Sequence, residues 1–241
     1  MKRLGSPRGA RRKSGPAQIA RTDVDLSTLN DPLIVSALSE TPNRSGRYRV
    51  AINGVDIGDV TIDFVADAGV REGTTITREQ AVEVVAAAHR TAVLDKALDL
   101  LAVRARSSRD LGLRLRRAGA QGPDISWAVA RLVAQGFVDD AAYARGVARA
   151  KALAGGVSRR KVITVLRQKG VAQDVATAAI DETLSEVDHD EYGAALAAAE
   201  KRMRALGSLE PAKRRQRLYA FLARRGYESD IVRRVLAEVM R

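Results

Sequence analysis

The sequence predicts a mainly α-helical protein, built as an elongated array of three tandem three-helix repeats after a disordered basic tail and a small β-hairpin element. Three observations predict this class. Apolar residues make up 46% of the 241 residues but aromatic residues only 4%, and the abundant Ala and Leu favour helices. A short stretch of alternating apolar residues precedes the helical part. One basic pattern with a glycine then occurs three times, as RLRRAGAQGPD (114–124), VLRQKGVAQD (165–174) and FLARRGYESD (221–230).

Residues 1–45 are expected to form the disordered basic tail, because Gly, Pro, Ser and Arg dominate and no apolar period is evident. Seven of the first 22 residues are basic and none is acidic. Such a tail could add non-specific affinity for phosphates, or it could have no role.

Residues 46–76 are expected to form the β-element. Tyr48, Val50 and Ile52 alternate with other residues, and so do Val60, Ile62 and Phe64. The dipeptide Asn53-Gly54 lies between the two runs and suits a tight hairpin turn. A hairpin of this size is not stable alone, so it must pack on the helices.

The helical part divides into a leading helix with the first repeat (77–138), a second repeat (139–187) and a third repeat (188–241). Residues that commonly start helices are spaced along it: Thr77 with Gln80, Ser107 with Asp110, Asp124, Asp139 or Asp140, Ser158, Asp174, Pro211, and Ser229 or Asp230. Gly119, Gly170 and Gly226 end the second helix of each repeat, 51 and 56 residues apart. Because one unit has little core of its own, neighbouring units should stack into an elongated body.

Charge is the feature that recurs on this body. The chain has 41 Lys and Arg against 29 Asp and Glu, a net charge of +12, which indicates either a polyanionic partner or simple solubility. The predicted binding residues lie on the second helices: Arg109, Arg114, Arg116, Arg159, Arg160, Arg167, Arg214, Arg215 and Arg224.

The basic residues of the second helices differ in their position along the helix. The helix dipole stabilises a cation in a last turn, which accounts for Arg117, Lys169 and Arg225. It disfavours cations in first turns, and five of the basic residues are placed there: Arg109, Arg159, Arg160, Arg214 and Arg215. We hypothesise that these five face an acidic partner, since local structure offers no reason for them.

No catalytic constellation is evident, so a non-enzymatic protein without cofactor is expected. There is no cysteine, which excludes thiolate chemistry and suits the cytoplasm. His89 is expected to be structural and His189 to belong to a solvated helix start. Asp139-Asp140 is interpreted as a helix cap rather than a metal site, and Trp127 as a core residue. No apolar run approaches the roughly 18 residues of a membrane span.

Four stretches resemble the RecX family, regulators of the RecA recombinase: LAVRARSSRDLGLRLRRAG (101–119), GFVDDAAYAR (136–145), GGVSRRKVITVLRQKGV (155–171) and RLYAFLARRGYESDI (217–231). The resemblance covers about residues 70–241. It implies three-helix repeats, binding to the RecA filament on single-stranded DNA, and modulation, usually inhibition, of strand exchange and ATP hydrolysis in DNA repair, recombination and the SOS response. It also implies that Gly136–Asp140 is structural, that the basic second helices line the binding face, and that no residue is catalytic. The protein is expected to be a monomer.

Two other readings stay open on the residues alone. Consecutive short helices with Arg-rich segments also suit a helix-turn-helix protein that binds duplex DNA directly, and a generic helical scaffold for protein partners is a third possibility. Contact with single-stranded DNA could be direct or through RecA.

Overall fold

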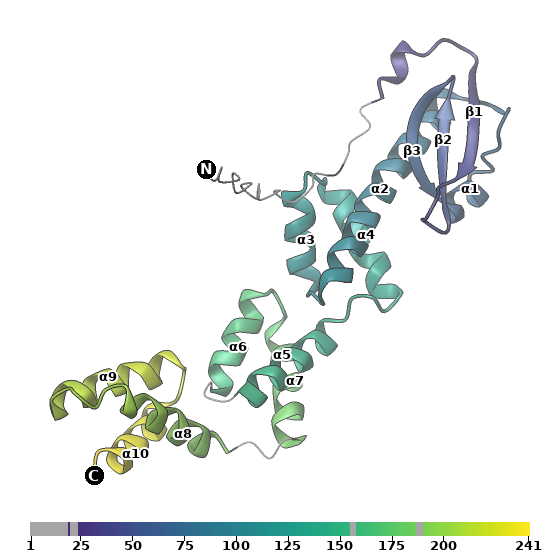
Figure 1. Ribbon diagram of the computed structural model, residues 1–241. Coiled ribbons are helices and arrows are strands. Elements are labelled where there is room, and N and C mark those ends of the chain that lie inside the picture. Colours follow the sequence, from purple (N-terminus) through teal and green to yellow (C-terminus); the bar gives the residue numbers. More distant parts are fainter. Residues whose placement is uncertain (1–18, 20–23, 155–157, 187–189) are drawn as a thin grey trace, which may run out of the picture. The chain divides into compact units, whose positions relative to one another are not determined.

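The chain is mainly helical, with one small antiparallel sheet near its N-terminus, as predicted (Figure 1). The structure is a computed structural model that describes residues 19, 24–154, 158–186 and 190–241. It divides into two compact units. Unit 1 comprises residues 1–98 and 114–128, and unit 2 comprises residues 99–113 and 129–241. Residues 1–18 and 20–23 of the predicted tail lie outside the described residues, and the boundaries predicted for the repeats stay a prediction.

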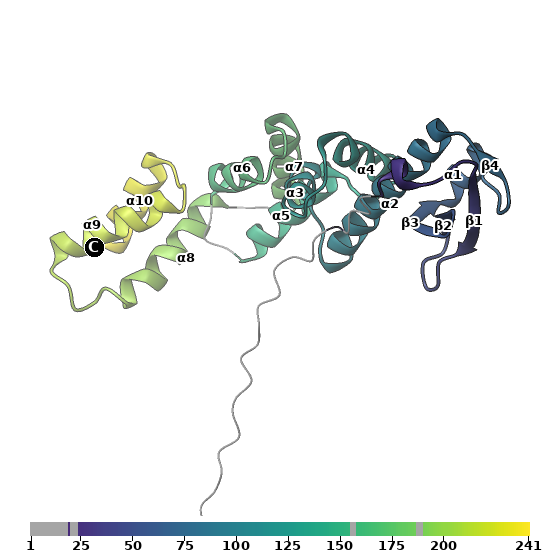
Figure 2. The same cartoon turned by 90° about the horizontal axis from the view of Figure 1, so that it is seen from above.

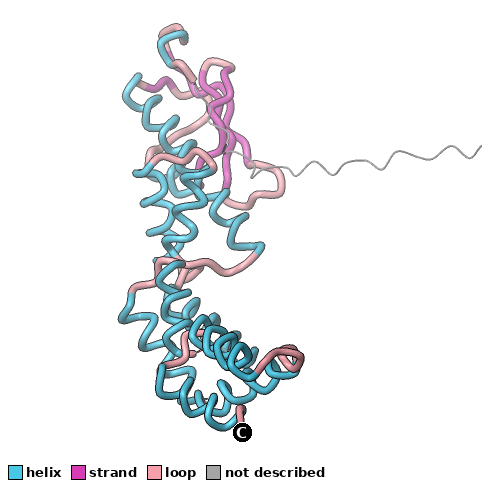
Figure 3. The backbone as a smooth tube through the Cα atoms, turned by 90° about the vertical axis from the view of Figure 1, so that its left-hand side faces the viewer, coloured by secondary structure: helices cyan, strands magenta, loops and turns pink. Residues whose placement is uncertain are grey.

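The sheet of unit 1 has four antiparallel strands in the order β3-β2-β1-β4. The strands are β1 (Leu33–Glu40), β2 (Arg47–Ile52), β3 (Val55–Thr61) and β4 (Thr75–Ile76), drawn in magenta in Figure 3. The predicted hairpin turn between β2 and β3 is confirmed, because Asn53 and Gly54 have φ angles of 49° and 79°. Both positive angles match a tight turn that asparagine and glycine tolerate.

The prediction of a structureless segment up to residue 45 is wrong for its last part. Residues 26–28 form a short 3-10 helix, and β1 pairs with β2 and β4. Leu33 and Val35 of β1 are buried in the core of unit 1. The strand therefore forms because it delivers apolar side chains to a sheet that the hairpin alone could not complete.

The second alternating run is also not one strand. Val60 belongs to β3, but Ile62 and Phe64 lie in the short helix α1 (Ile62–Asp67). The Thr61 hydroxyl accepts a hydrogen bond from the Phe64 amide at 3.3 Å and starts that helix. A side-chain cap therefore overrides a strand-like alternation at this point.

The long helix α2 (Arg78–Val103) begins at the predicted capping box. The Thr77 amide donates to the Gln80 side chain at 2.8 Å, and the Gln80 amide donates to the Thr77 hydroxyl at 3.2 Å. Apolar residues in the first half of α2, among them Ala81 and Val84, join the core under the sheet. Farther along α2, the buried Asp95 binds Arg47 of β2, which fastens the sheet to the helix.

Eight further helices follow in the described part of the chain: α3 (Ser108–Arg117), α4 (Gly122–Ala134), α5 (Asp140–Ala154), α6 (Arg159–Gln168), α7 (Gln173–Glu186), α8 (Glu191–Arg204), α9 (Pro211–Arg224) and α10 (Ser229–Val239). The predicted stops are confirmed, since Gly119, Gly170 and Gly226 have φ angles of 96°, 82° and 89° after α3, α6 and α9. We call α3, α6 and α9 the second helices.

The helix starts are confirmed in part. Ser158 caps α6, and Pro211 is at the first position of α9. Asp124, Asp174 and Asp230, however, lie inside the first turns of α4, α7 and α10, which begin one or two residues earlier. An acidic side chain in a first turn is stabilised by the helix dipole without being the cap, so both placements look alike in a sequence.

Helices α5, α6 and α7 share one core and α8, α9 and α10 share another, as the grouping in Figure 2 illustrates. Leu166 of α6 is buried in the first of these cores, and Leu218 and Leu222 of α9 in the second. Trp127 of α4 is half-buried, less than the core placement that we predicted. These two cores leave the polar sides of α6 and α9 exposed.

Candidate binding surface on the second helices

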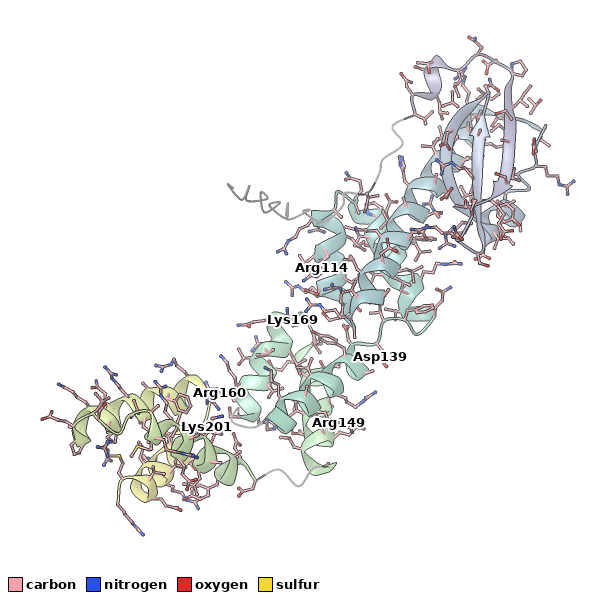
Figure 4. The ribbon with its side chains drawn as sticks, viewed as in Figure 1. Arg114, Asp139, Arg149, Arg160, Lys169 and Lys201 are labelled. Carbon is pink, nitrogen blue, oxygen red and sulfur yellow. The ribbon has the colours of Figure 1, made fainter. Side chains whose placement is uncertain are left out.

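Helix α6 is amphipathic, and its basic side faces solvent. Val162 and Leu166 point into the core of the second repeat, whereas Arg160 and Arg167 are exposed. Within the described part of the chain, neither Arg160 nor Arg167 has a carboxylate in ion-pair distance. Figure 4 shows Arg160 and Lys169 toward opposite ends of α6 and Arg149 on the other side of the repeat.

Arg159 differs from its neighbour. Its Nε and Nη2 atoms donate to Oδ1 of Asp181 on α7 at 2.9 and 2.6 Å. The two side chains are 39% and 56% exposed, so the pair adds little stability. The hypothesis that local structure offers no reason for a first-turn cation is nevertheless wrong for Arg159, because α7 supplies the carboxylate.

Arg214 of α9 also has a local reason. It is half-buried, and its Nη2 atom donates to the carbonyl oxygens of Gly207 and Leu209 at 3.2 and 2.9 Å. These bonds close the turn between α8 and α9. The neighbouring Arg215 and the last-turn Arg224 are exposed, so they remain available to a partner.

Just before α3, Arg106 has a structural role. Arg106 is only 6% exposed; it donates to the Leu100 carbonyl oxygen at 3.1 Å and to Asp110 at 3.0 Å. Arg109 and Arg116 are exposed, and Arg114 is half-buried with an interaction of its own. Of the nine predicted binding residues, six are thus exposed and three are held: Arg114, Arg159 and Arg214. A binding role for any of them stays a prediction.

The two aspartates at the start of α5, Asp139 and Asp140, accept hydrogen bonds from different parts of the chain. Oδ1 of Asp139 accepts hydrogen bonds from the amides of Ala141 and Ala142 at 2.8 and 2.9 Å, which is a helix cap. Oδ1 of Asp140 accepts from the Ser108 amide at 2.7 Å and ties α5 to the start of α3. The capping interpretation is confirmed for Asp139, and the bond from Asp140 to α3 was not foreseen.

The described residues hold no group of three or more His, Cys, Asp or Glu side chains that could bind a metal ion. His189 lies outside the described residues. Within the part of the chain that the structure describes, no helix combines the length and apolarity needed to cross a lipid bilayer.

The second helices of unit 2 meet end to end, a feature that sequence reasoning missed. The Ser107 hydroxyl, at the start of α3, donates to the Lys169 carbonyl oxygen at the end of α6. The Ser158 amide, at the start of α6, donates to the Arg225 carbonyl oxygen at the end of α9 at 3.2 Å. The available signal was a serine at the same distance before Gly119 and before Gly170.

This arrangement also changes the electrostatics of the first turns. The negative end of α6 lies against the positive end of α3, and the two partial charges attract each other. The stem of Arg109 contacts the position of Gly170, directly after the last carbonyl groups of α6. A neighbouring helix end therefore offsets the dipole that disfavours a cation at Arg109, so this residue too has a local reason.

Comparisons with known proteins agree on one family. Residues 139–180 match the family model "RecX, second three-helix domain" and residues 189–236 match "RecX, third three-helix domain". The chain is 35% identical to "Regulatory protein RecX" of Amycolatopsis mediterranei over 144 residues, which are 59% of this chain and 80% of the relative. It is 32% identical to the protein of that name from Chlorobaculum tepidum, over 63% of this chain and 90% of the relative.

Solved structures show the same fold. "Crystal structure of regulatory protein RecX" is similar with a TM-score of 0.70 and 21% identity, over 84% of this chain and 98% of that one. The RecX structure from Lactobacillus salivarius is similar with a TM-score of 0.52 and 17% identity, over 62% of this chain and 96% of that one.

Proposed function

Because the chain belongs to the RecX family, we propose that it is a non-enzymatic regulator that binds the RecA filament on single-stranded DNA and inhibits its recombinase and ATPase activity. The activity belongs to DNA repair and recombination in the cytoplasm and needs no cofactor, and the protein acts as a monomer. The family membership supports a regulatory role. The finer statements, including the partner, are the proposal.

The observation that carries the proposal is the exposed basic side of consecutive second helices. Arg160 and Arg167 on α6 are exposed, and so are Arg215 and Arg224 on α9. A nucleoprotein filament is a long, repeating and largely acidic object, so equivalent cations on successive repeats can contact successive equivalent sites. Several weak contacts on one chain then give a high overall affinity, and the net charge of +12 speeds association.

The test is the DNA-dependent ATPase of the host RecA on single-stranded DNA, measured while this protein is added. We expect the rate to fall until the filament is saturated. An unchanged rate at saturating protein would contradict the proposal. Tight binding to one duplex sequence without RecA would instead support the helix-turn-helix alternative, whose second helices would contact duplex DNA directly.

Charge reversal locates the surface. Arg160→Glu should weaken filament binding and lower the slope of log affinity against log salt by about one, because one phosphate or carboxylate contact is lost. Arg71→Glu is the matched control, since Arg71 is an exposed cation in unit 1, outside the second helices. Both variants change the net charge equally, so identical behaviour would show that only overall charge matters.

A further inference from the structure

The two end-to-end contacts between second helices join equivalent positions. In each, the carbonyl group of the residue before a helix-ending glycine accepts a hydrogen bond from the serine that starts the second helix of the preceding repeat. The Ser107 hydroxyl is the donor in one contact and the Ser158 backbone amide in the other. The acceptors are Lys169 and Arg225, and the donors are Ser107 and Ser158. All of these residues lie in unit 2. We call the two contacts the α6–α3 joint and the α9–α6 joint.

The glycines in these joints lie against the neighbouring helix. A Cβ atom on Gly170 would lie 2.4 Å from Cβ of Arg109 and 2.2 Å from its Cδ. One on Gly226 would lie 2.6 Å from Oγ of Ser158 and 2.9 Å from Cβ of Lys161. Both glycines also have positive φ angles. Each joint therefore requires a glycine for two reasons, the positive φ angle and the close approach of the neighbouring helix.

Gly119 provides the comparison within the same chain. It ends α3 with a φ angle of 96°, yet a Cβ atom there would have nothing within 4 Å. No second helix precedes α3, and the Ala118 carbonyl oxygen accepts its hydrogen bond from the Ile19 amide at 3.0 Å. Gly119 thus shares the backbone requirement of Gly170 and Gly226 but not their contact with a neighbour.

We infer that Gly170 and Gly226 are positioning residues, which set how closely successive second helices approach and thereby fix the spacing of the cations on them. The inference rests on the proposed function, because it assigns that spacing to a partner with repeating sites. Arg160 and Arg167 lie on one side of the α9–α6 joint, and Arg215 and Arg224 lie on the other. A shift at the joint changes the distance between the pairs but leaves each pair intact.

A periodic partner and a small ligand should therefore respond differently. Several contacts to a filament require that all cations match its repeat at once, and that advantage is lost when the geometry forbids simultaneous contact. A ligand that spans one repeat meets an unchanged pair of cations. The joints should matter for the first kind of partner only.

The experiment compares Gly170→Ala and Gly226→Ala with Gly119→Ala as the matched control. Each variant and the wild type is measured for binding to RecA filaments on long single-stranded DNA and to a short heparin fragment that spans one repeat. All three variants carry the strain of alanine at positive φ. We expect the two joint variants to bind filament about tenfold or more weakly than Gly119→Ala, because avidity is lost, and to bind the heparin fragment equally well.

Three results would overturn the inference or its basis. Equal filament affinity of the joint variants and Gly119→Ala would overturn it. An equal loss toward the heparin fragment would also overturn it, because the cations themselves would then be disturbed. A wild type that does not bind filament at all would instead show that the proposed function is wrong, and the inference would fall with it.

Gly226→Ala could lose the fold of the third repeat, which hydrogen exchange in α8, α9 and α10 would reveal. A companion variant then still tests the inference. Ser158→Gly removes the atom nearest to the added methyl group, and glycine is an acceptable helix cap. The double variant Gly226→Ala with Ser158→Gly should regain part of the filament affinity relative to Ser158→Gly alone. Absence of any recovery, with the fold intact, would count against the joint contact as the cause.

Discussion

Asp95→Ala is expected to lower the local opening free energy of the sheet by about 3 kcal/mol, because the buried ion pair that joins the sheet to α2 is broken. This value is at the lower end of what breaking a buried ion pair costs. Asp95 is 9% exposed. Its Oδ1 atom accepts two hydrogen bonds from Arg47, at 2.9 and 2.8 Å, and its Oδ2 atom lies 2.7 Å from Nη1 of Arg44. The Arg47 side chain is 14% exposed, so its charge would be left largely buried without this carboxylate.

The contribution of Arg44 is smaller, because its side chain is 43% exposed and a pair of that kind is worth about 0–1 kcal/mol. Hydrogen exchange of the β2 and β3 amides is the suitable assay, since it reports the local opening free energy in a chain with two compact units. Asp56→Ala is the control, because the Arg49–Asp56 pair is more than half exposed on both sides. If both variants changed the opening free energy by the same amount, below about 1 kcal/mol, the reasoning from burial would be refuted.

Three more outcomes concern a cap and two ionisable groups. Ser158→Ala should destabilise the start of α6 by about 1 kcal/mol, because the hydroxyl accepts the Lys161 amide, and amide exchange in that turn measures the loss. Tyr227→Phe should leave stability at neutral pH nearly unchanged, because the buried hydroxyl has no hydrogen-bond partner among the described residues. Burial raises the pKa of Tyr227 to about 12, so the wild type should lose stability relative to the variant between pH of about 10 and 12, as alkaline denaturation series would show. Hydrogen bonding from Arg49 lowers the pKa of Asp56, so the β2–β3 hairpin should lose stability as the pH falls below about 4, and Asp56→Asn should lack that dependence in exchange measurements.

Each of these has a clear contrary result. Unaltered exchange in the first turn of α6 would show that Ser158 does not cap the helix. Parallel alkaline denaturation of wild type and Tyr227→Phe would show that other groups cause the loss. An identical acid response of wild type and Asp56→Asn would remove the carboxylate from the explanation.

The repeats could be predicted from the sequence because a helix stop is a local property. A glycine at positive φ after a helix needs no distant partner, so Gly119, Gly170 and Gly226 mark the second helices on their own. The same holds for Ser158, whose hydroxyl bonds an amide only three residues away. The exposure of Arg160 and Arg167 likewise agrees with the amphipathic spacing of α6, whose Val162 and Leu166 are buried.

Strand β1 could not be predicted in the same way, because its alternation is short and interrupted. Only Leu33 and Val35 are fully buried, and the equally apolar Ile34 between them is 37% exposed. A bulge between Val35 and Ala37 then shifts the register against β2. A period that lasts for two residues is no signal against a background rich in Ser and Pro.

The roles of the cations depended on packing that a sequence does not display. Arg159 finds Asp181 only because α7 folds back against α6, and Arg214 finds carbonyl groups only in the folded turn before α9. Arg109 lies by the end of a helix from the next repeat. The charge pattern thus located basic residues on the second helices but could not separate the cations that the fold holds from those that stay exposed.

The hydrogen bond from the Ile19 amide to the Ala118 carbonyl oxygen bears on self-association. Head-to-tail contacts that do not close into a ring generate open-ended fibres. In the series of second helices, the Ala118 carbonyl oxygen at the end of α3 is the acceptor that a further helix from another molecule would need. The Ile19 amide already donates to it. At the other end, the cap position of α9 is Glu210 where α6 has Ser158, and the Glu210 side chain makes no capping hydrogen bond. Because the Ala118 carbonyl oxygen already accepts the Ile19 amide, this acceptor is not left open at the α3 end for a joint with a second molecule.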